Sequence, residues 1–94
     1  MKYFIDTHDR AKASFPAEEV TQEQFLAIYS GFDEALEAGG GFAIGGAHVN
    51  LAEGKAYCLT CAADVAVVTA AHDKIGLPYD GITQVQRVTG MDLR

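Results

Sequence analysis

The alternation of hydrophobic and polar positions predicts six elements in the order strand, helix, strand, strand, helix, strand. Residues 2–8 alternate between two faces, as a strand does, with Tyr3, Ile5 and Thr7 on one face and Phe4, Asp6 and His8 on the other. Two further extended runs, residues 42–51 and 55–61, are separated by a short turn that ends at Gly54, which favours a hairpin. Residues 82–88 predict the last strand.

Both predicted helices have start and stop signals. Thr21 and Gln24 have the spacing of a capping box, and glycines at positions 39–41 end the first helix. Asp64 is placed to cap the second helix, which Gly76 and Pro78 stop. Residues at helical spacing form one face of each helix: Phe25, Ile28, Tyr29, Phe32 and Leu36 in the first, and Val65, Val68, His72 and Ile75 in the second.

The order βαββαβ predicts an α+β, ferredoxin-like sandwich, in which two helices cover one face of a four-stranded antiparallel sheet. We expect one domain over residues 1–94. The other sheet face would be bare, and alternation assigns Phe4, Phe42 and Ile44 to it, with a bulge at Gly45 and Gly46 able to change the phase. Because exposed apolar side chains are costly in water, we expect a homodimer through this open face.

Composition narrows the classes of partner. The chain has 49% hydrophobic and 21% charged residues, as a folded globular protein does. Its net charge of −6 disfavours binding to nucleic acid and attracts cations. No apolar run approaches the roughly 20 residues of a membrane helix. No secretion signal precedes the first strand, and two cysteines are too few for a disulfide framework, so we expect a cytoplasmic protein.

Candidate metal ligands cluster at the end of the first strand. Asp6 and His8 share a face, Asp9 follows, and imidazole with carboxylate suits nickel, cobalt or zinc. In this fold the C-terminal end of the second helix, with His72, lies near the same end of the strand. However, Asp6 and His8 lie on the strand face opposite Ile5, whereas His72 lies on the helix face that is expected to meet the sheet. The three side chains would then meet only if the strand ends or twists near His8, or if a second subunit supplies part of the site. Otherwise His72 is a core histidine and His8 is an exposed residue at the end of the strand.

The remaining reactive side chains have simpler interpretations. Cys58 and Cys61 are three residues apart along a strand, so they face opposite sides and neither a redox pair nor a zinc knuckle is expected. We interpret them as small, buried hydrophobic residues. His48 is expected to be exposed or to lie at the dimer interface.

Several short motifs carry a resemblance to a known family. The first strand reads aliphatic-Asp-x-His, Tyr57-Cys58-Leu59 lies on the third strand, and residues 71–78 read Ala-His-x-x-x-Gly-Leu-Pro before an Ile-x-x-Val strand. These motifs resemble those of small bacterial proteins known as nickel-binding proteins or as a domain of unknown function. The resemblance implies a ferredoxin-like dimer with a metal site of histidine and acidic side chains, and it matches Asp6, His8, Cys58 and His72. Where family members carry further histidines, this chain has Gly76 and Tyr29.

Three functions are consistent with these observations. The first is a cytoplasmic homodimer that binds nickel or another divalent transition metal through Asp6, His8 and His72, without catalysis. The second is a cofactor-free enzyme of the dimeric α+β-barrel kind, acting on a small apolar molecule, with Tyr29 and Tyr57 lining a pocket and His72 as general base. The third is a structural or interaction module without a small-molecule site.

Overall fold

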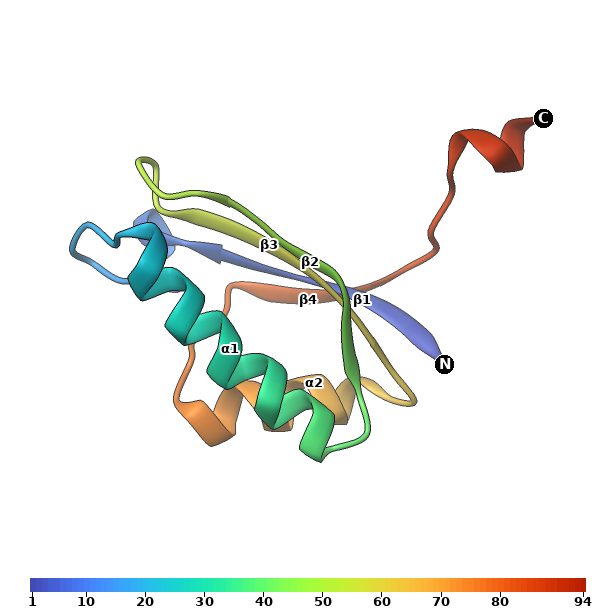
Figure 1. The fold of residues 1–94 in the computed structure, drawn as a ribbon, viewed down its shortest axis with the longest axis horizontal. Coiled ribbons are helices and arrows are strands. Elements are labelled where there is room, and N and C mark those ends of the chain that lie inside the picture. Colours follow the sequence, from blue (N-terminus) through green and yellow to red (C-terminus); the bar gives the residue numbers. More distant parts are fainter.

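Figure 1 presents the fold of residues 1–94, all of which are described in this computed structural model. The main elements are β1 (Lys2–Asp9), α1 (Gln22–Ala38), β2 (Phe42–Asn50), β3 (Lys55–Ala62), α2 (Val65–Ile75) and β4 (Gly81–Val85), with short 3-10 helices at Arg10–Lys12 and Gly90–Leu93. All strand pairs are antiparallel, in the order β2-β3-β1-β4, and both helices lie on the same side of the sheet (Figure 1). The predicted α+β, ferredoxin-like fold is confirmed.

The helix boundaries follow the predicted signals. Thr21 and Gln24 form the capping box at the start of α1, and Gly39 is the C-cap. Asp64 caps α2 by accepting a hydrogen bond from the backbone N–H of Ala66, and Gly76 ends the helix with a φ of 65°, in the left-handed region.

The core lies between the helices and the sheet. Its fully buried members include Phe4, Phe32, Leu36 and Val68. Phe4 is only 2% exposed, whereas Phe42 and Ile44 are 52% and 56% exposed. The assignment of Phe4 to the open face is therefore wrong, while Phe42 and Ile44 are exposed as expected. Because β1 carries apolar residues on both faces, its alternation does not reveal which face meets the helices.

The buried face of α2 covers a shorter part of the helix than predicted. Val68, Ala71 and His72 are buried, but Val65 and Ile75, at the two ends of the helix, are partly exposed. The buried side chains of α2 therefore all come from the middle of the helix.

The hairpin and its bulge agree with the glycine positions. Gly54 has a φ of 69° in the turn between β2 and β3. The register of β2 against β3 shifts between Phe42 and Gly46, and Gly46 has a φ of 70°. A side chain at Gly45 would lie 2.4 Å from the Leu59 side chain, so only glycine allows this close approach.

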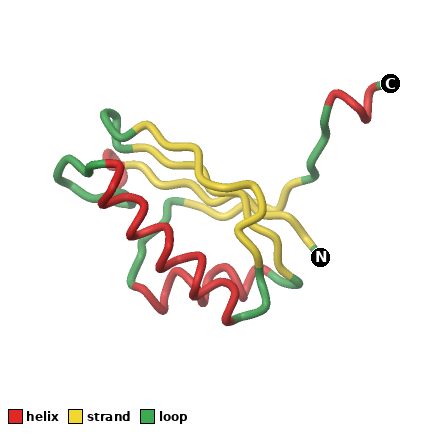
Figure 2. The backbone as a smooth tube through the Cα atoms, viewed as in Figure 1, coloured by secondary structure: helices red, strands yellow, loops and turns green.

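The last strand is shorter than predicted. Val85 pairs with Tyr3 near the start of β1, and β4 ends there, three residues earlier than expected. Residues 86–94, which we call the C-terminal arm, leave the sheet and extend away from the rest of the molecule (Figure 2).

Candidate metal centre

Asp6 and His8 point from β1 toward the helices, together with Phe4. Their side chains are buried, as is that of His72 on α2. The expectation that Asp6 and His8 face away from His72 is wrong, because it took Ile5 as the inward residue of the strand. Neither a strand twist nor a second subunit is needed to bring the three side chains together.

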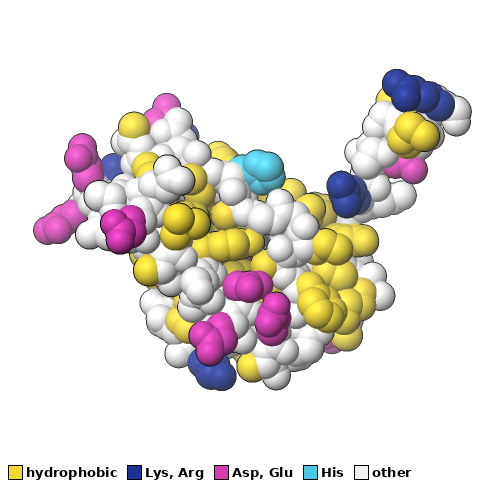
Figure 3. Space-filling model, viewed as in Figure 1, with side chains coloured by type: hydrophobic (Ala, Val, Ile, Leu, Met, Phe, Trp, Pro, Cys, Tyr) yellow, Lys and Arg dark blue, Asp and Glu magenta, His cyan; other side chains and the backbone are white.

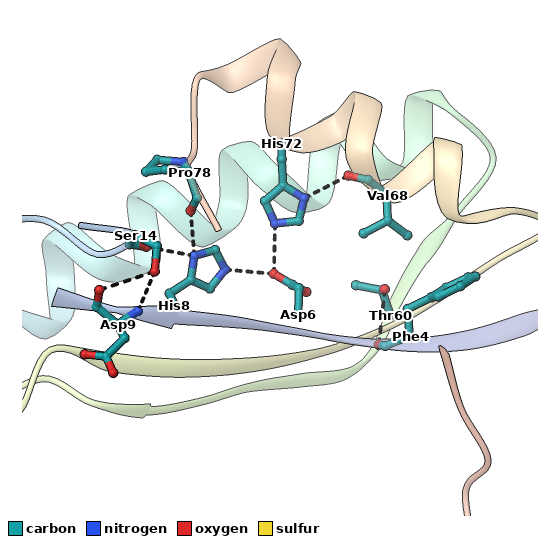
Figure 4. A network of polar contacts seen from close by, with 9 residues as sticks. All are labelled: Phe4, Asp6, His8, Asp9, Ser14, Thr60, Val68, His72 and Pro78. Carbon is teal, nitrogen blue, oxygen red and sulfur yellow. Dashed lines mark hydrogen bonds and ion pairs between the residues drawn. The ribbon is translucent and has the colours of Figure 1, made fainter. Parts of the chain in front are cut away.

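The two imidazole rings meet at one carboxylate oxygen. The Nε2 atom of His8 lies 2.7 Å from Oδ2 of Asp6, and the Nε2 atom of His72 lies 2.8 Å from the same oxygen (Figure 4). The antiparallel sheet and the βαβ crossover thus join residues that are 66 positions apart in sequence. All three side chains predicted as metal ligands form one cluster.

The other ring nitrogens are held by backbone carbonyl groups. His8 Nδ1 donates to the carbonyl oxygens of Pro78 at 2.8 Å and Ser14 at 3.1 Å. His72 Nδ1 donates to the carbonyl of Val68, one helical turn earlier, at 2.8 Å (Figure 4). Because a carbonyl oxygen can only accept, each Nδ1 carries a hydrogen. Both rings are thereby fixed with Nε2 toward Asp6.

The protonation equilibria of the cluster are coupled. Burial raises the pKa of Asp6, but the hydrogen bonds and charges of His72 and His8 outweigh it, so the pKa falls below its usual value. Burial lowers the pKa of His8, but the hydrogen bond to Asp6 and its charge raise the pKa above the usual value. Asp6 is therefore held as a carboxylate and His8 as an imidazolium in this arrangement.

One carboxylate oxygen has no partner. Oδ1 of Asp6 is buried and makes no hydrogen bond, while Oδ2 accepts two. A buried, unpaired acceptor typically costs about 1–3 kcal/mol. Oδ1 of Asp6 is therefore available to accept a hydrogen bond or to bind a cation.

Cys58 is a member of the cluster that the metal prediction omitted. It pairs with Asp6 across β3 and β1, and the ligand atoms of Asp6, His8 and Cys58 all lie within 4.8 Å of one another. Burial, followed by the charge of Asp6, raises the pKa of the Cys58 thiol to about 12. The antiparallel register could have revealed this neighbour, but the sequence alone does not fix that register.

Three other candidates lie outside the cluster. Asp9 caps the short 3-10 helix by accepting from the backbone N–H of Ala11, and His48 is exposed on β2. Cys61 is buried beside Met1 on the sheet face opposite Cys58, and both cysteines are free thiols, in agreement with the predicted lack of a redox pair.

A small cavity adjoins the cluster. Asp6, His8, His72 and Cys58 line it together with Tyr29, and the space open to the centre of a water molecule is about 30 Å³. Roughly 10–15 Å³ is needed for one water, whereas pockets for small organic molecules measure about 300–1,000 Å³. The cavity suits water or an ion and offers little room for a substrate. Tyr57, assigned to the pocket in the enzymatic alternative, is instead half-exposed.

Comparison with known proteins identifies the fold. No protein-family model and no curated protein matches the chain. Among solved structures, it is similar to SCO4226 from Streptomyces coelicolor A3(2), with a TM-score of 0.76 and 20% sequence identity over 93% of this chain and 99% of that one. At this identity the likeness concerns the fold. No helix of the chain has the length and apolar character needed to cross a membrane.

Proposed function

We propose that the protein binds a divalent transition metal, nickel foremost, through Asp6, His8 and His72, with Cys58 as a further sulfur ligand. One observation carries the proposal. The Nε2 atoms of two buried histidines converge on one carboxylate, while their Nδ1 hydrogens are held by backbone carbonyls. Histidines that ligate a metal usually have this arrangement, because the second hydrogen bond fixes the ring and leaves the other nitrogen for the metal.

The donor set suits a borderline metal. Two imidazoles, a carboxylate and a thiol favour nickel, cobalt or zinc over the oxygen-preferring magnesium and calcium. The unpartnered Oδ1 of Asp6 supplies an additional ligand atom, and the net charge of −6 attracts cations to the molecule. Nickel is placed first because the motifs around Asp6, His8 and His72 resemble those of nickel-binding proteins.

Metal binding would displace protons from the cluster. Each Nε2 that donates to Asp6 must lose its hydrogen before its lone pair can reach a metal, and the Cys58 thiol must ionise to bind as a thiolate. The affinity should therefore rise with pH.

A purely structural role for the cluster is the main competing explanation. Asp6 and the two histidines would then serve as a buried hydrogen-bond network that orients β1 and α2. Such a network needs a water in the adjoining cavity to pair Oδ1 and leaves the Cys58 thiol without a role, whereas a metal centre uses both. The small cavity favours a bound ion over the enzymatic alternative.

Calorimetric titration of tag-free, chelator-treated protein with nickel, cobalt and zinc tests the proposal. We expect one metal per chain, binding at micromolar concentration or tighter, and loss of binding in the His8→Ala/His72→Ala double variant. His48→Ala is the matched control, since His48 is exposed and pairs with Tyr57 on the sheet face opposite the cluster, and it should bind as the wild type does. Absence of heat at tens of micromolar metal, or unchanged heat in the double variant, would contradict the proposal.

A further inference from the structure

The C-terminal arm carries large apolar side chains that are mostly exposed. Val88, Met91 and Leu93 are 63%, 71% and 82% exposed. The side-chain hydrogen bonds of the arm, between Thr89 and Asp92 and from Arg94 to Met91, remain within it. In Figures 1 and 2 the arm extends from the end of β4 away from both the sheet and the helices. It is an ordered segment without a packing partner in its own chain.

The sheet face opposite the helices, which we call the open face, is also unpaired and apolar. Phe42, Ile44 and Tyr57 are about half-exposed on β2 and β3. Positions 3, 5 and 7 of β1 and 57, 59 and 61 of β3 hold no charged residue, whereas Asp9, Lys55 and His48 lie at one end of this face. Figure 3 shows hydrophobic side chains gathered on the body next to the point where the arm leaves it.

The total surface is larger than that of a compact monomer. The chain has a mass of 10.0 kDa and exposes 5904 Å². A compact protein of that mass exposes about 5,200 Å². The excess of about 700 Å² is close to the roughly 800 Å² that each partner buries in a stable interface. The radius of gyration, 13.3 Å, likewise exceeds the value of about 12.4 Å for a domain of this length.

From these observations we infer that a second copy of the chain covers the open face, and that each copy's C-terminal arm packs across the open face of the other. The arm is long enough for this. Its extended residues and its 3-10 turn together span about 20 Å, and four strands are about 15 Å wide. Val88, Met91 and Leu93 can therefore reach the exposed side chains on β2 and β3 of the other copy.

The position of the arm favours exchange between copies over folding back. The arm leaves the sheet from β4, at one edge, whereas Phe42 and Ile44 lie on β2, at the opposite edge. The arm leaves the sheet at Val85, and Phe42 lies level with Val85 on the opposite edge strand, so covering its own Phe42 would require the arm to turn sideways across its own sheet. The arm rises on the side of the sheet away from the helices (Figure 1), the side that a second copy would cover, and in a two-fold assembly both arms would bury their apolar residues at once. The inference is independent of the proposed metal centre, which lies within one subunit.

Light scattering over a range of protein concentrations, on the full chain and on a chain that ends at Val85, gives the first test. We expect the full chain to be dimeric at micromolar concentration, and the shortened chain to dissociate at least tenfold more readily while circular dichroism shows an unchanged fold. The Met91→Ser/Leu93→Ser variant should behave like the shortened chain, and Arg94→Ala should behave like the wild type. A monomeric full chain, or an equal dissociation constant for the full and shortened chains, would overturn the inference.

Exchange itself is tested by mixing ¹³C-labelled and unlabelled protein and recording isotope-filtered nuclear Overhauser spectra, which detect only contacts between copies. The methyl groups of Met91 and Leu93 should show cross-peaks to the rings of Phe42 and Tyr57. If a dimer forms but the filtered spectra lack these cross-peaks, the arms are not exchanged and the inference is wrong.

Discussion

The two faces of the sheet have opposite chemistry, and each is unusual for its position. The face that packs against the helices buries Asp6 and His8 next to His72 of α2, whereas the open face exposes Phe42 and Ile44 to solvent. Buried polar groups and exposed apolar groups are both costly, so each requires a compensating interaction. This contrast underlies the two proposals, a metal ion at the inner face and a second copy of the chain at the outer face.

Removing the inner carboxylate should produce the largest effect. Asp6→Ala leaves the Nε2 atoms of His8 and His72 without their shared acceptor in a buried site. We expect the free energy of unfolding of the metal-free protein to fall by about 3–5 kcal/mol, as when one partner of a buried ion pair is removed. Urea unfolding measures the loss. Asp73→Ala, an exposed position on α2, is the control, and a loss of less than 1 kcal/mol for Asp6→Ala would contradict this view of the inner face.

A charge on the open face should separate the subunits. Phe42→Glu places a carboxylate in the proposed interface, where it would be buried without a partner, and we expect the free energy of dimerisation to weaken by about 2–4 kcal/mol. The mass measured by light scattering should approach 10.0 kDa. Val65→Glu, which is also partly exposed but on the helical layer, should leave the mass of the dimer unchanged. Equal behaviour of the two variants would show that the open face has no special role.

The two cysteines offer a closely matched comparison between the faces. Cys58→Ala should weaken metal binding by about 10–100-fold, because it removes a donor beside Asp6 and His8. Cys61→Ala, three residues along the same strand but on the other face, should leave the affinity unchanged. Competition with a metal-binding dye measures both. An equal affinity in the two variants would remove Cys58 from the ligand set.

The smallest expected effect is a pH dependence of stability in the metal-free protein. Because Asp6 has a lowered pKa in the folded state, its contribution is present above pH 3.8 and is lost as the pH falls below that value. Because His8 has a raised pKa, its contribution is complete below pH 6.5 and is lost as the pH rises through the folded pKa. Cys58 and Tyr29, which line the same cavity, have raised pKa values and stay neutral over this range.

The interaction between Asp6 and His8 should therefore stabilise the metal-free fold most between roughly pH 4 and 6.5. Urea midpoints measured from pH 3 to 8 should pass through a maximum in that interval, and Asp6→Asn should flatten it. A wild-type midpoint that still rises between pH 6.5 and 8 would disagree with the coupling of Asp6 to His8.

Much of the fold could be predicted because its signals are local. The capping box of Thr21 and Gln24, the cap at Asp64 and the stop at Gly76 act over one turn of helix, and each lies where the sequence indicated. The candidate ligands Asp6, His8 and His72 were also identifiable, since their residue types and the strand and helix order bring them to one end of the fold. The prediction failed where the choice was between two faces of β1.

The sequence by itself determined the element order, the helix boundaries and the alternation of β1, because capping, glycine conformations and strand pleating depend on neighbouring residues. Only the tertiary structure decided that Phe4, rather than Ile5, meets the helices, since both faces of β1 are apolar and the packing of α1 and α2 selects one of them. The same packing brought His72 to Asp6, and the register of β1 with β3 brought Cys58 beside them. These contacts join residues more than fifty positions apart, over which local sequence patterns exert no control.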